Sequence, residues 1–442
     1  MRRIDYIISE LKDQYLIEDN FRPWIIGFSG GKDSTALLQL VWHAILEINP
    51  EDRKRPVYVV CNDTMVENPI IKDYVSDVLT KIERSAVSHG LPIYVKNTIP
   101  RLEDTFWTNV IGRGYPVPNN TFRWCTDKMK IKPTSRFIIE QVAENGEAII
   151  LIGTRSSESA TRARSIKKHE IKGKRLTKHP HHPNTFVYSP IKDLFLEEVW
   201  YIINKMPSPW GADNSKLFQI YFDALADDYE CPTMATDDSH RSCGQSRFGC
   251  WTCTVIKEDK SLSAQVDKGQ LWLKPLKDLR EKMYKDRNDS DNRMPTRRNG
   301  QIAINADGEN RGSYKIEYRA KLLEQLLLAQ KQMQNFNPNI ELITNQELVA
   351  IQVAWYRDLL FSYNVSEIYS RVYEKELDVR KDDKKFQRDQ REINLLKMVC
   401  QETPSDFNLI QDLLKLQKNK ALLNRKRGLK DDIGRVIEQY IN

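Results

Sequence analysis

The sequence lacks long hydrophobic runs: no eighteen consecutive residues are apolar, and the charged N-terminus has no apolar core. We therefore expect neither a membrane-spanning helix nor a secretory signal, and we expect a cytoplasmic protein with no membrane partner. Cysteine is scarce and odd in number, with seven among 442 residues, which argues against a secreted disulfide scaffold. The net charge of +7 is modest, so it permits a polyanionic partner without demonstrating one.

The most informative segment is a glycine-rich turn that follows an apolar run over residues 24–28. Apolar residues at helical spacing come after it, and the turn itself reads Ser29, Gly30, Gly31, Lys32, Asp33 and Ser34. A strand, a glycine turn and a helix N-terminus make an anion site, because unpaired N–H groups and the helix dipole face the anion. Lys32 adds a full positive charge. Because the glycines are adjacent and the lysine follows directly, the spacing is not that of a Walker P-loop.

Up to about residue 205, strand-like and helix-like segments alternate, which predicts an α/β fold with a doubly wound, mostly parallel sheet. Further strands are expected at residues 57–61, 92–95 and 148–152, and helices from Pro69 toward His89 and from Pro133 to Asn145. After about residue 345 the pattern is helical and mixed in charge. We expect domains over residues 1–210, 211–330 and 331–442, the middle one rich in cysteine and the last one helical.

Polar residues follow two of the expected strands, where a parallel sheet binds its ligands. Carboxylates there can hold Mg²⁺ on a triphosphate, and arginines can neutralise phosphates through forked hydrogen bonds. Each residue alone is as well explained by a solvated loop charge or a helix cap, but together they predict a nucleotide site. Its expected members beyond the glycine turn are Asp63, Thr64, Gly153, Arg155, Glu158 and Arg162.

Four cysteines form a second constellation in a turn-rich segment. Their spacing is C-x11-C-x6-C-x2-C, at Cys231, Cys243, Cys250 and Cys253. Four thiolates within 23 residues predict one metal centre, because the reducing compartment expected here disfavours disulfides. Spacing alone does not separate an iron–sulfur cluster from a structural zinc site, since both use four cysteines.

Of the other cysteines, Cys125 has the most reactive surroundings. It lies beside Arg123 and Lys128, whose charges are expected to lower the pKa of its thiol and to favour a nucleophilic thiolate. This predicts a persulfide acceptor, although a packed loop cysteine explains the position equally well. Cys61 and Cys400 are expected to be structural or incidental.

Basic segments over residues 162–182 and at Arg293, Arg297 and Arg298 are expected to contact a phosphodiester backbone without reading its sequence. A solvated loop explains the first segment as well. No recognition helix or zinc-finger spacing is evident, so we expect any sequence specificity to come from a partner.

Several strings in the chain resemble a known family. The glycine turn resembles the PP-loop of ATP pyrophosphatases. The strings D-T-x-x-E at residues 63–67, G-x-R-x-x-E-S-x-x-R at 153–162 and P-I-x-D at 190–193 are similar to the phosphoadenosine phosphosulfate reductase family, a branch of that fold. Longer strings, E-D-T-F-W at 103–107, F-R-W-C-T at 122–126 and R-F-G-C-W-T-C at 247–253, resemble the DndC sulfurtransferases of bacterial DNA phosphorothioation. The likeness covers about the first three-quarters of the chain.

This resemblance implies an ATP pyrophosphatase that adenylates a DNA backbone phosphate and replaces an oxygen by sulfur, with Lys32, Asp33 and Arg155 in catalytic roles. It implies ATP, Mg²⁺ and a [4Fe-4S] cluster rather than zinc. It also implies a DNA substrate, a cysteine desulfurase as sulfur donor, and the other subunits of the phosphorothioation complex as partners. The alternatives are a phosphoadenosine phosphosulfate reductase, a tRNA thiolase, or an ATP-binding scaffold without catalysis.

Overall fold

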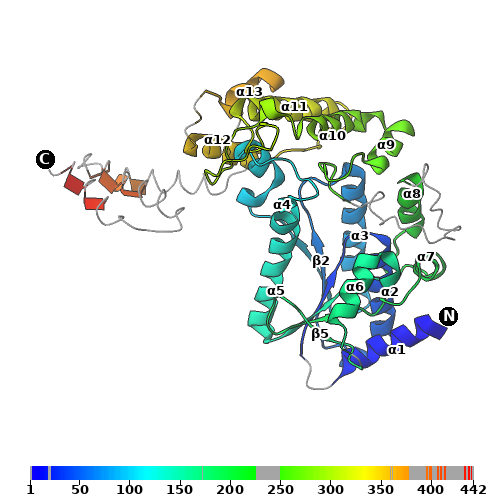
Figure 1. Cartoon of the computed structure of the whole chain (residues 1–442). Helices are drawn as coiled ribbons and strands as arrows, with labels where there is room; N and C mark the ends of the chain where they lie inside the picture. The colour runs from blue at the N-terminus through cyan, green and yellow to red at the C-terminus, as the bar shows by residue number, and fades with distance from the viewer. Residues whose placement is uncertain are drawn as a thin grey trace. The chain divides into compact units, whose positions relative to one another are not determined.

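The computed structural model describes residues 2–17, 21–171, 173–224 and 249–377, apart from 359 and 361, and short helical stretches between 395 and 440 (Figure 1). The chain forms two compact units, Met1–Leu377 and Asp378–Asn442. The expected domain division at residues 210 and 330 stays a prediction.

The first unit contains a six-stranded sheet with the order β3-β2-β1-β4-β6-β5. Neighbouring strands pair in parallel, except that β5 runs antiparallel to β6. The predicted mostly parallel α/β fold is therefore confirmed. The strands are β1 (Trp24–Gly27), β2 (Val57–Asn62), β3 (Ile93–Thr98), β4 (Ala148–Leu151), β5 (Thr177–Lys178) and β6 (Thr185–Tyr188). Because β1 lies between β2 and β4, a ligand crevice is expected beyond its carboxyl end.

Helices cover both faces of this sheet. Those of the sheet-bearing part are α1 (Arg2–Leu16), α2 (Lys32–Leu46), α3 (Pro69–Ser88), α4 (Trp124–Thr126), α5 (Lys132–Asn145), α6 (Ala160–His169), α7 (Leu196–Lys205) and α8 (Asn214–Ala224). The α3 start has Asn68 accepting a hydrogen bond from Ile70 N, with Pro69 in the first turn. The α5 end has Gly146 with φ of 78°, as the Asn-Gly pair predicted.

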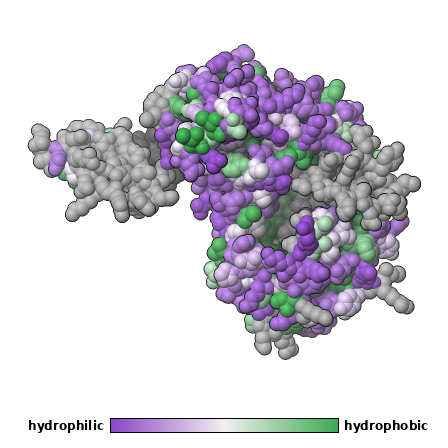
Figure 2. All heavy atoms as spheres, viewed as in Figure 1, coloured by the Kyte–Doolittle hydropathy of each residue, from purple (hydrophilic) through white to green (hydrophobic). Residues whose placement is uncertain are grey.

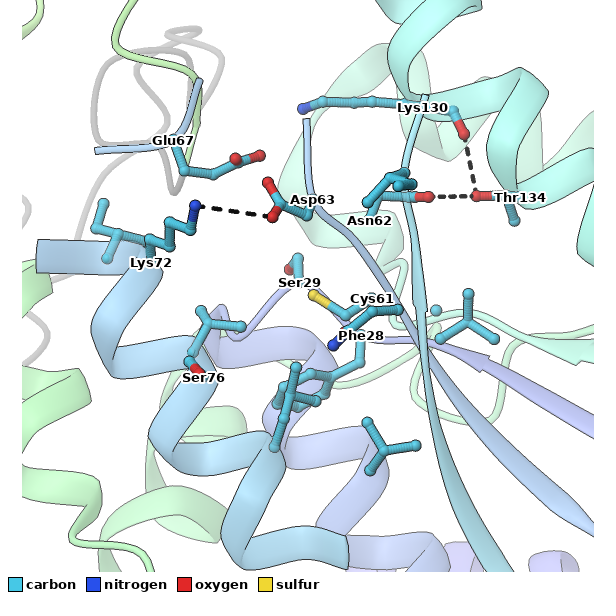
Figure 3. A pocket seen from close by; sticks show the side chains of 18 of the residues that line it. Phe28, Ser29, Cys61, Asn62, Asp63, Glu67, Lys72, Ser76, Lys130 and Thr134 are labelled. Atoms are coloured by element: carbon cyan, nitrogen blue, oxygen red, sulfur yellow. Dashed lines mark hydrogen bonds and ion pairs between the residues drawn. The ribbon is translucent and has the colours of Figure 1, made fainter. Parts of the chain in front are cut away.

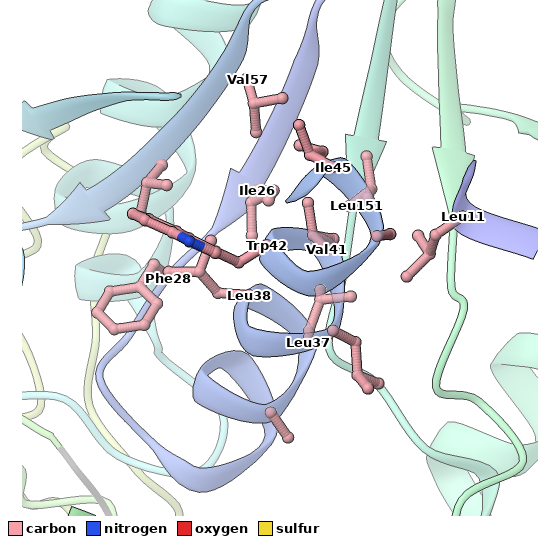
Figure 4. Close-up of a cluster of buried hydrophobic side chains, with 14 of the residues drawn as sticks. Leu11, Ile26, Phe28, Leu37, Leu38, Val41, Trp42, Ile45, Val57 and Leu151 are labelled. Atoms are coloured by element: carbon pink, nitrogen blue, oxygen red, sulfur yellow. The ribbon is translucent and has the colours of Figure 1, made fainter. Parts of the chain in front are cut away.

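Strand residues alternate between the two faces, so each apolar run serves two cores. Ile26, Val57 and Leu151 pack with α2, where Leu37, Leu38, Val41, Trp42 and Ile45 form the facing surface (Figure 4). The intervening residues Ile25, Val60 and Ile150 pack on the other face against Phe137 and Ile138 of α5. This double burial explains why the strands read as nearly continuous apolar runs.

A second core joins the connection between β3 and α5 to later helices. These helices are α9 (Lys260–Asp267), α10 (Lys274–Asp286), α11 (Ile316–Gln334), α12 (Asn345–Arg357) and α13 (Val365–Tyr373). Trp107 Nε1 donates to Leu342 O at 2.8 Å, and Trp355 Nε1 donates to Ile111 O at 2.9 Å. Residues 105–129 are therefore held by a helical layer that the chain forms more than a hundred residues later.

The predicted helical region after residue 345 is confirmed, and one face of α12 is buried. Leu348, Ile351 and Trp355 are buried, whereas Val349 and Val353 are 36% and 47% exposed. No helix among the described residues combines the length and the apolar character that crossing a membrane requires.

Candidate active site

The glycine turn joins the carboxyl end of β1 to the N-terminus of α2, as predicted. Gly30 has φ of +73°, and a Cβ there would lie 2.6 Å from Val75 Cγ2, so both backbone conformation and space favour glycine. The Ser34 hydroxyl donates to Gly31 O at 3.0 Å and lies 3.2 Å from the Ser29 hydroxyl. Gly31 begins α2 without a side-chain cap, so the turn presents backbone N–H groups at a helix N-terminus, as an anion site requires.

Tyr221 of α8 covers this turn, and sequence reasoning missed it. Its hydroxyl accepts a hydrogen bond from Lys32 N at 3.3 Å, and Lys32 Nζ lies 5.0 Å from the centre of its ring. A tyrosine on an amphipathic helix gives no signal of such a contact, because a core position has the same pattern. Tyr221 therefore contacts both the backbone and the side chain of Lys32.

Arg155 is paired with Asp33 of the glycine turn. Its side chain is 3% exposed, and Nε lies 2.6 Å from Asp33 Oδ1 while Nη1 donates to the Ser157 hydroxyl at 2.9 Å. Nε and Nη1 thus serve protein oxygens in this structure, and the prediction that Arg155 binds phosphate stays a prediction. Asp33 also lies 3.4 Å from Lys32 Nζ, so Arg155 fixes the carboxylate that in turn positions the lysine.

The loop after β4 packs directly on the glycine turn. A Cβ on Gly153 would lie 2.9 Å from Asp33 O, so this glycine permits the close approach of the two backbones. Ser156 N donates to Lys192 O at 2.8 Å, which brings the P-I-x-D segment to the same edge, as the shared strand ends predicted. Glu158 is half-buried nearby, and the side chain of Arg162 lies outside the described residues.

Two carboxyl groups face each other beyond β2 (Figure 3). Glu67 Oε1 accepts from Thr64 N at 2.9 Å, whereas its Oε2 is buried without a hydrogen-bond partner among the described residues. Burial, together with the nearby Asp63 charge, raises the pKa of Glu67 to about 7. Asp63 itself lies 3.9 Å from Lys72 Nζ. An unpartnered carboxylate oxygen beside a second carboxylate fits a magnesium ion, and the glutamate that ends the D-T-x-x-E string was the sequence signal for this pair.

A cavity of about 430 Å³ extends from this pair along the ends of β1, β2 and β3. Its apolar wall comes mainly from α3, and its polar residues include Ser29, Asn62, Lys130 and Thr134. Figure 2 shows a hollow in the surface over the region where β2 and α3 lie in Figure 1. The end of the glycine turn, the carboxylate pair and an apolar wall therefore border a single crevice.

Three cysteine thiols lie next to this crevice. Cys250 Sγ is 3.2 Å from the Thr64 hydroxyl, and Trp251 N donates to Val66 O at 3.0 Å. Cys253 N donates to Cys250 O at 3.1 Å, and Cys125 lies close enough to both thiols to interact with them electrostatically.

The predicted low pKa of Cys125 is wrong. Burial raises the pKa of its thiol, a nearby Cys253 thiolate would raise it further, and Lys130 opposes the rise, whereas Lys128 is paired with Asp104 at 2.5 Å. Cys61 is buried with its pKa raised to about 12, which agrees with the expected structural role.

The predicted ligand set is only partly described. Cys231 and Cys243 lie outside the described residues, and within the described ranges no three histidine, cysteine or acidic side chains form a ready metal site. Thiols are nevertheless the donors that an iron–sulfur cluster takes. Cys125, Cys250 and Cys253 are half-buried, and Cys125 is close enough to the other two for an electrostatic interaction.

A protein-family model matches about half of the chain. The profile of the phosphoadenosine phosphosulfate reductase domain matches residues 23–256. An uncharacterised protein of Methanocaldococcus jannaschii is 26% identical over 239 residues, and the match spans 53% of this chain and 41% of that protein. This chain therefore corresponds to less than half of that relative.

Solved structures resemble the chain at low identity. A phosphoadenylyl-sulfate reductase from Candida auris in a phosphate complex is 14% identical, with a TM-score of 0.31, over 54% of this chain and 95% of that one. The U34-tRNA thiolase NcsA from Methanococcus maripaludis with its [4Fe-4S] cluster is 15% identical, with a TM-score of 0.29, over 50% and 74%. At these identities and scores the likeness does not identify a reaction.

Proposed function

The chain belongs to the phosphoadenosine phosphosulfate reductase domain family, and from this premise we propose that it is a DndC-type sulfurtransferase of DNA phosphorothioation. It would use ATP to adenylate a DNA backbone phosphate and then exchange one non-bridging oxygen for sulfur. The observation that carries the proposal is the contact at Thr64. Its hydroxyl bonds Glu67 of the carboxylate pair on one side and lies 3.2 Å from Cys250 Sγ on the other.

The first step is adenylation. A non-bridging oxygen of the DNA phosphate attacks the α-phosphorus of ATP, the bond to the bridging oxygen of the β-phosphate breaks, and pyrophosphate leaves with the electron pair. Lys32 and the N–H groups at the start of α2 stabilise the charge that collects on the leaving pyrophosphate. Asp33, held by Arg155, keeps Lys32 in place for this task.

The second step is redox-neutral. A hydrosulfide ion attacks the adenylated DNA phosphorus, AMP leaves with the oxygen that it gained, and the proton of the hydrosulfide goes to solvent. Adenylation is needed because an unmodified phosphate oxygen is a very poor leaving group. The product is a phosphorothioate with the backbone intact.

The proposed reaction also needs two bound groups, a magnesium ion and an iron–sulfur cluster. Asp63 and Glu67 would hold Mg²⁺, which neutralises charge on the triphosphate. Cys125, Cys250 and Cys253, together with Cys231 or Cys243, would hold a [4Fe-4S] cluster, which supplies a binding place for inorganic sulfur beside the nucleotide. This assignment replaces the expected persulfide role of Cys125, because its thiol is half-buried and burial raises its pKa. A cysteine desulfurase and further subunits of the complex remain the proposed partners.

Product analysis tests the nucleotide chemistry. Anaerobically purified protein with DNA and Mg²⁺-ATP is expected to release pyrophosphate and AMP. Lys32→Ala is expected to abolish that release, whereas Lys274→Ala, which removes only a surface ion pair with Asp278, is expected to leave it unchanged. ADP and orthophosphate as the main products would sink the assignment. Stimulation by tRNA instead of DNA would favour a thiolase.

A further inference from the structure

A second cavity, away from the nucleotide crevice, has the chemistry of a nucleic-acid pocket. Its volume is about 740 Å³, and two segments line it: residues 115–128 and a hairpin over residues 288–313. The lining contains the basic residues Lys128, Arg293, Arg297, Arg298 and Arg311 and no aspartate or glutamate. An anionic ligand is therefore favoured over a neutral or cationic one.

The walls are held in place by backbone and buried contacts. Tyr314 N donates to Gly114 O at 2.7 Å, and Arg298 Nη1 donates to Arg113 O at 3.1 Å, so the two segments are tied together. Arg293 is buried and donates to three backbone carbonyls, those of Gly312 and Arg311 in the hairpin and that of Arg287 just before it. The cavity is thus preformed rather than dependent on a ligand to assemble it.

The basic residues differ in how far their charge is already used. Arg298 makes a two-pronged ion pair with Asp358 at 2.7 and 2.9 Å, and Arg311 pairs with Glu309. Lys128 pairs with Asp104. Arg297, at the hairpin tip, is exposed and makes no side-chain hydrogen bond or ion pair with a described residue. Unlike the other basic residues of this cavity, Arg297 has all of its guanidinium N–H groups available to bind a phosphate.

An aromatic wall faces the hairpin. Phe122 is 41% exposed, and its ring lies 6.3 Å from that of Tyr115, which packs at 5.6 Å on Trp124. Asn119 Oδ1 accepts from Thr121 N and Phe122 N at 2.9 and 2.8 Å, which fixes the turn that holds Phe122 outward. An exposed ring on a fixed turn beside an open arginine is the arrangement that stacks a base and binds its phosphate.

We propose that this cavity binds one unpaired nucleotide of the DNA strand, with its base stacked on Phe122 and its phosphate on Arg297. The proposal rests on the function proposed above, and it names the form of the substrate that the protein captures. Trp124 and Lys128, which line the cavity, flank Cys125 in the chain. A base that stacks on Phe122 cannot remain in the duplex stack, so single-stranded or locally opened DNA is preferred.

Fluorescence anisotropy with a labelled twelve-nucleotide single strand and its duplex, in the absence of ATP, tests the proposal on the full-length protein. Phe122→Ala is expected to weaken single-strand binding by roughly 5- to 150-fold, the range of one lost stacking contact, and Phe122→Tyr is expected to restore it. Arg297→Gln is expected to weaken binding about 10-fold and to reduce the salt slope by about 0.7, as for one phosphate contact.

Matched controls are Phe21→Ala and Arg84→Gln, because both residues are exposed and lie outside the cavity. They are expected to bind like the unaltered protein. The proposal is overturned if Phe122→Ala and Arg297→Gln bind normally, if Phe122→Ala weakens duplex and single strand equally, or if RNA of the same sequence binds more than about 10-fold tighter. Failure of pyrophosphate release with normal single-strand capture would instead reject the proposed reaction and leave this site standing.

Discussion

Arg155 and Asp33 form a largely buried ion pair beside the glycine turn. The guanidinium and the carboxylate lie largely out of water, so removing one partner leaves the other charge buried. Arg155→Met or Asp33→Asn alone is expected to lower the free energy of unfolding by about 3 kcal/mol. The double variant is expected to lose little more than either single variant, and urea unfolding of the four proteins measures this coupling. Additive losses would show that the pair is not a unit.

At the residue scale, the sequence predicts which residues lie at the site better than it predicts which side chains they contact. The glycine turn, Lys32 and Asp63 all lie at the predicted edge of the sheet, because strand ends follow from the apolar pattern. The pairing of Arg155 with Asp33 could not be read, since it depends on how closely β4 approaches α2. The prediction of a low pKa for the Cys125 thiol was wrong for a related reason. The neighbours in sequence suggested that cations would lower the pKa, whereas burial and a nearby thiol raise it.

The approach of the β4 loop to α2 is a property of two elements, and Gly153 permits it. Gly153→Ala is expected to push the backbone at Asp33 outward, because the new Cβ would lie 2.9 Å from Asp33 O. We expect loss of ATP binding in equilibrium dialysis although no ligand group is removed. Gly146→Ala is the control: its φ of 78° makes alanine cost about 1 kcal/mol, but its Cβ meets open space and ATP binding should be unchanged. Normal ATP binding by Gly153→Ala would contradict the packing role.

The start of α12 gives a pH prediction. Thr344 and Glu347 form a capping box, and burial raises the pKa of the Glu347 carboxyl above its ordinary value of 4.5. The folded chain therefore binds this proton more tightly than the unfolded chain, so the group's contribution to stability falls as pH rises above the unfolded value. Glu347→Gln keeps an acceptor oxygen for Thr344 N and removes the charge.

We expect the stability of Glu347→Gln relative to the unaltered protein to increase between about pH 5 and about pH 8, as measured by urea unfolding at both values. If the stability of Glu347→Gln relative to the unaltered protein decreased over that range, the inference that burial disfavours the charged carboxylate would be wrong.

At the scale of elements, the apolar pattern predicted the strands and the main helices, because double burial and caps leave strong local signals. It did not predict which face of α12 is buried. Leu348, Ile351 and Trp355 are buried because they pack against the segment around Ile111. The helix contacts this segment only in the folded chain.

The whole molecule brings three thiols together from separate parts of the chain, and iron removal tests their common role. In the iron-loaded protein, Cys125, Cys250 and Cys253 are expected to resist iodoacetamide, and anaerobic chelation is expected to make all three reactive. Cys61 is expected to stay unlabelled in both states, because it is buried with a pKa of about 12. Peptide mass spectrometry reads the labels. Reaction of Cys125 in the loaded protein would separate it from the cluster and restore the persulfide role.

The second core explains why the sequence did not show this gathering of thiols. Residues 105–129 leave the sheet after β3 and are fixed by helices α10 to α12, so Cys125 reaches Cys250 and Cys253 only when both halves of the first unit are folded. Spacing within one segment predicted the C-x2-C pair, but a ligand more than a hundred residues away leaves no trace in local spacing.

The proposed reaction places sulfur in the DNA backbone, and mass spectrometry of nuclease-digested DNA measures that product. DNA from cells that contain the unaltered protein is expected to yield phosphorothioate-linked dinucleotides. DNA from cells without it, or with Lys32→Ala in its place, is expected to yield none. Unmodified DNA from cells that contain the full-length, iron-loaded protein and its partners, or sulfur found in tRNA nucleosides instead, would contradict the account.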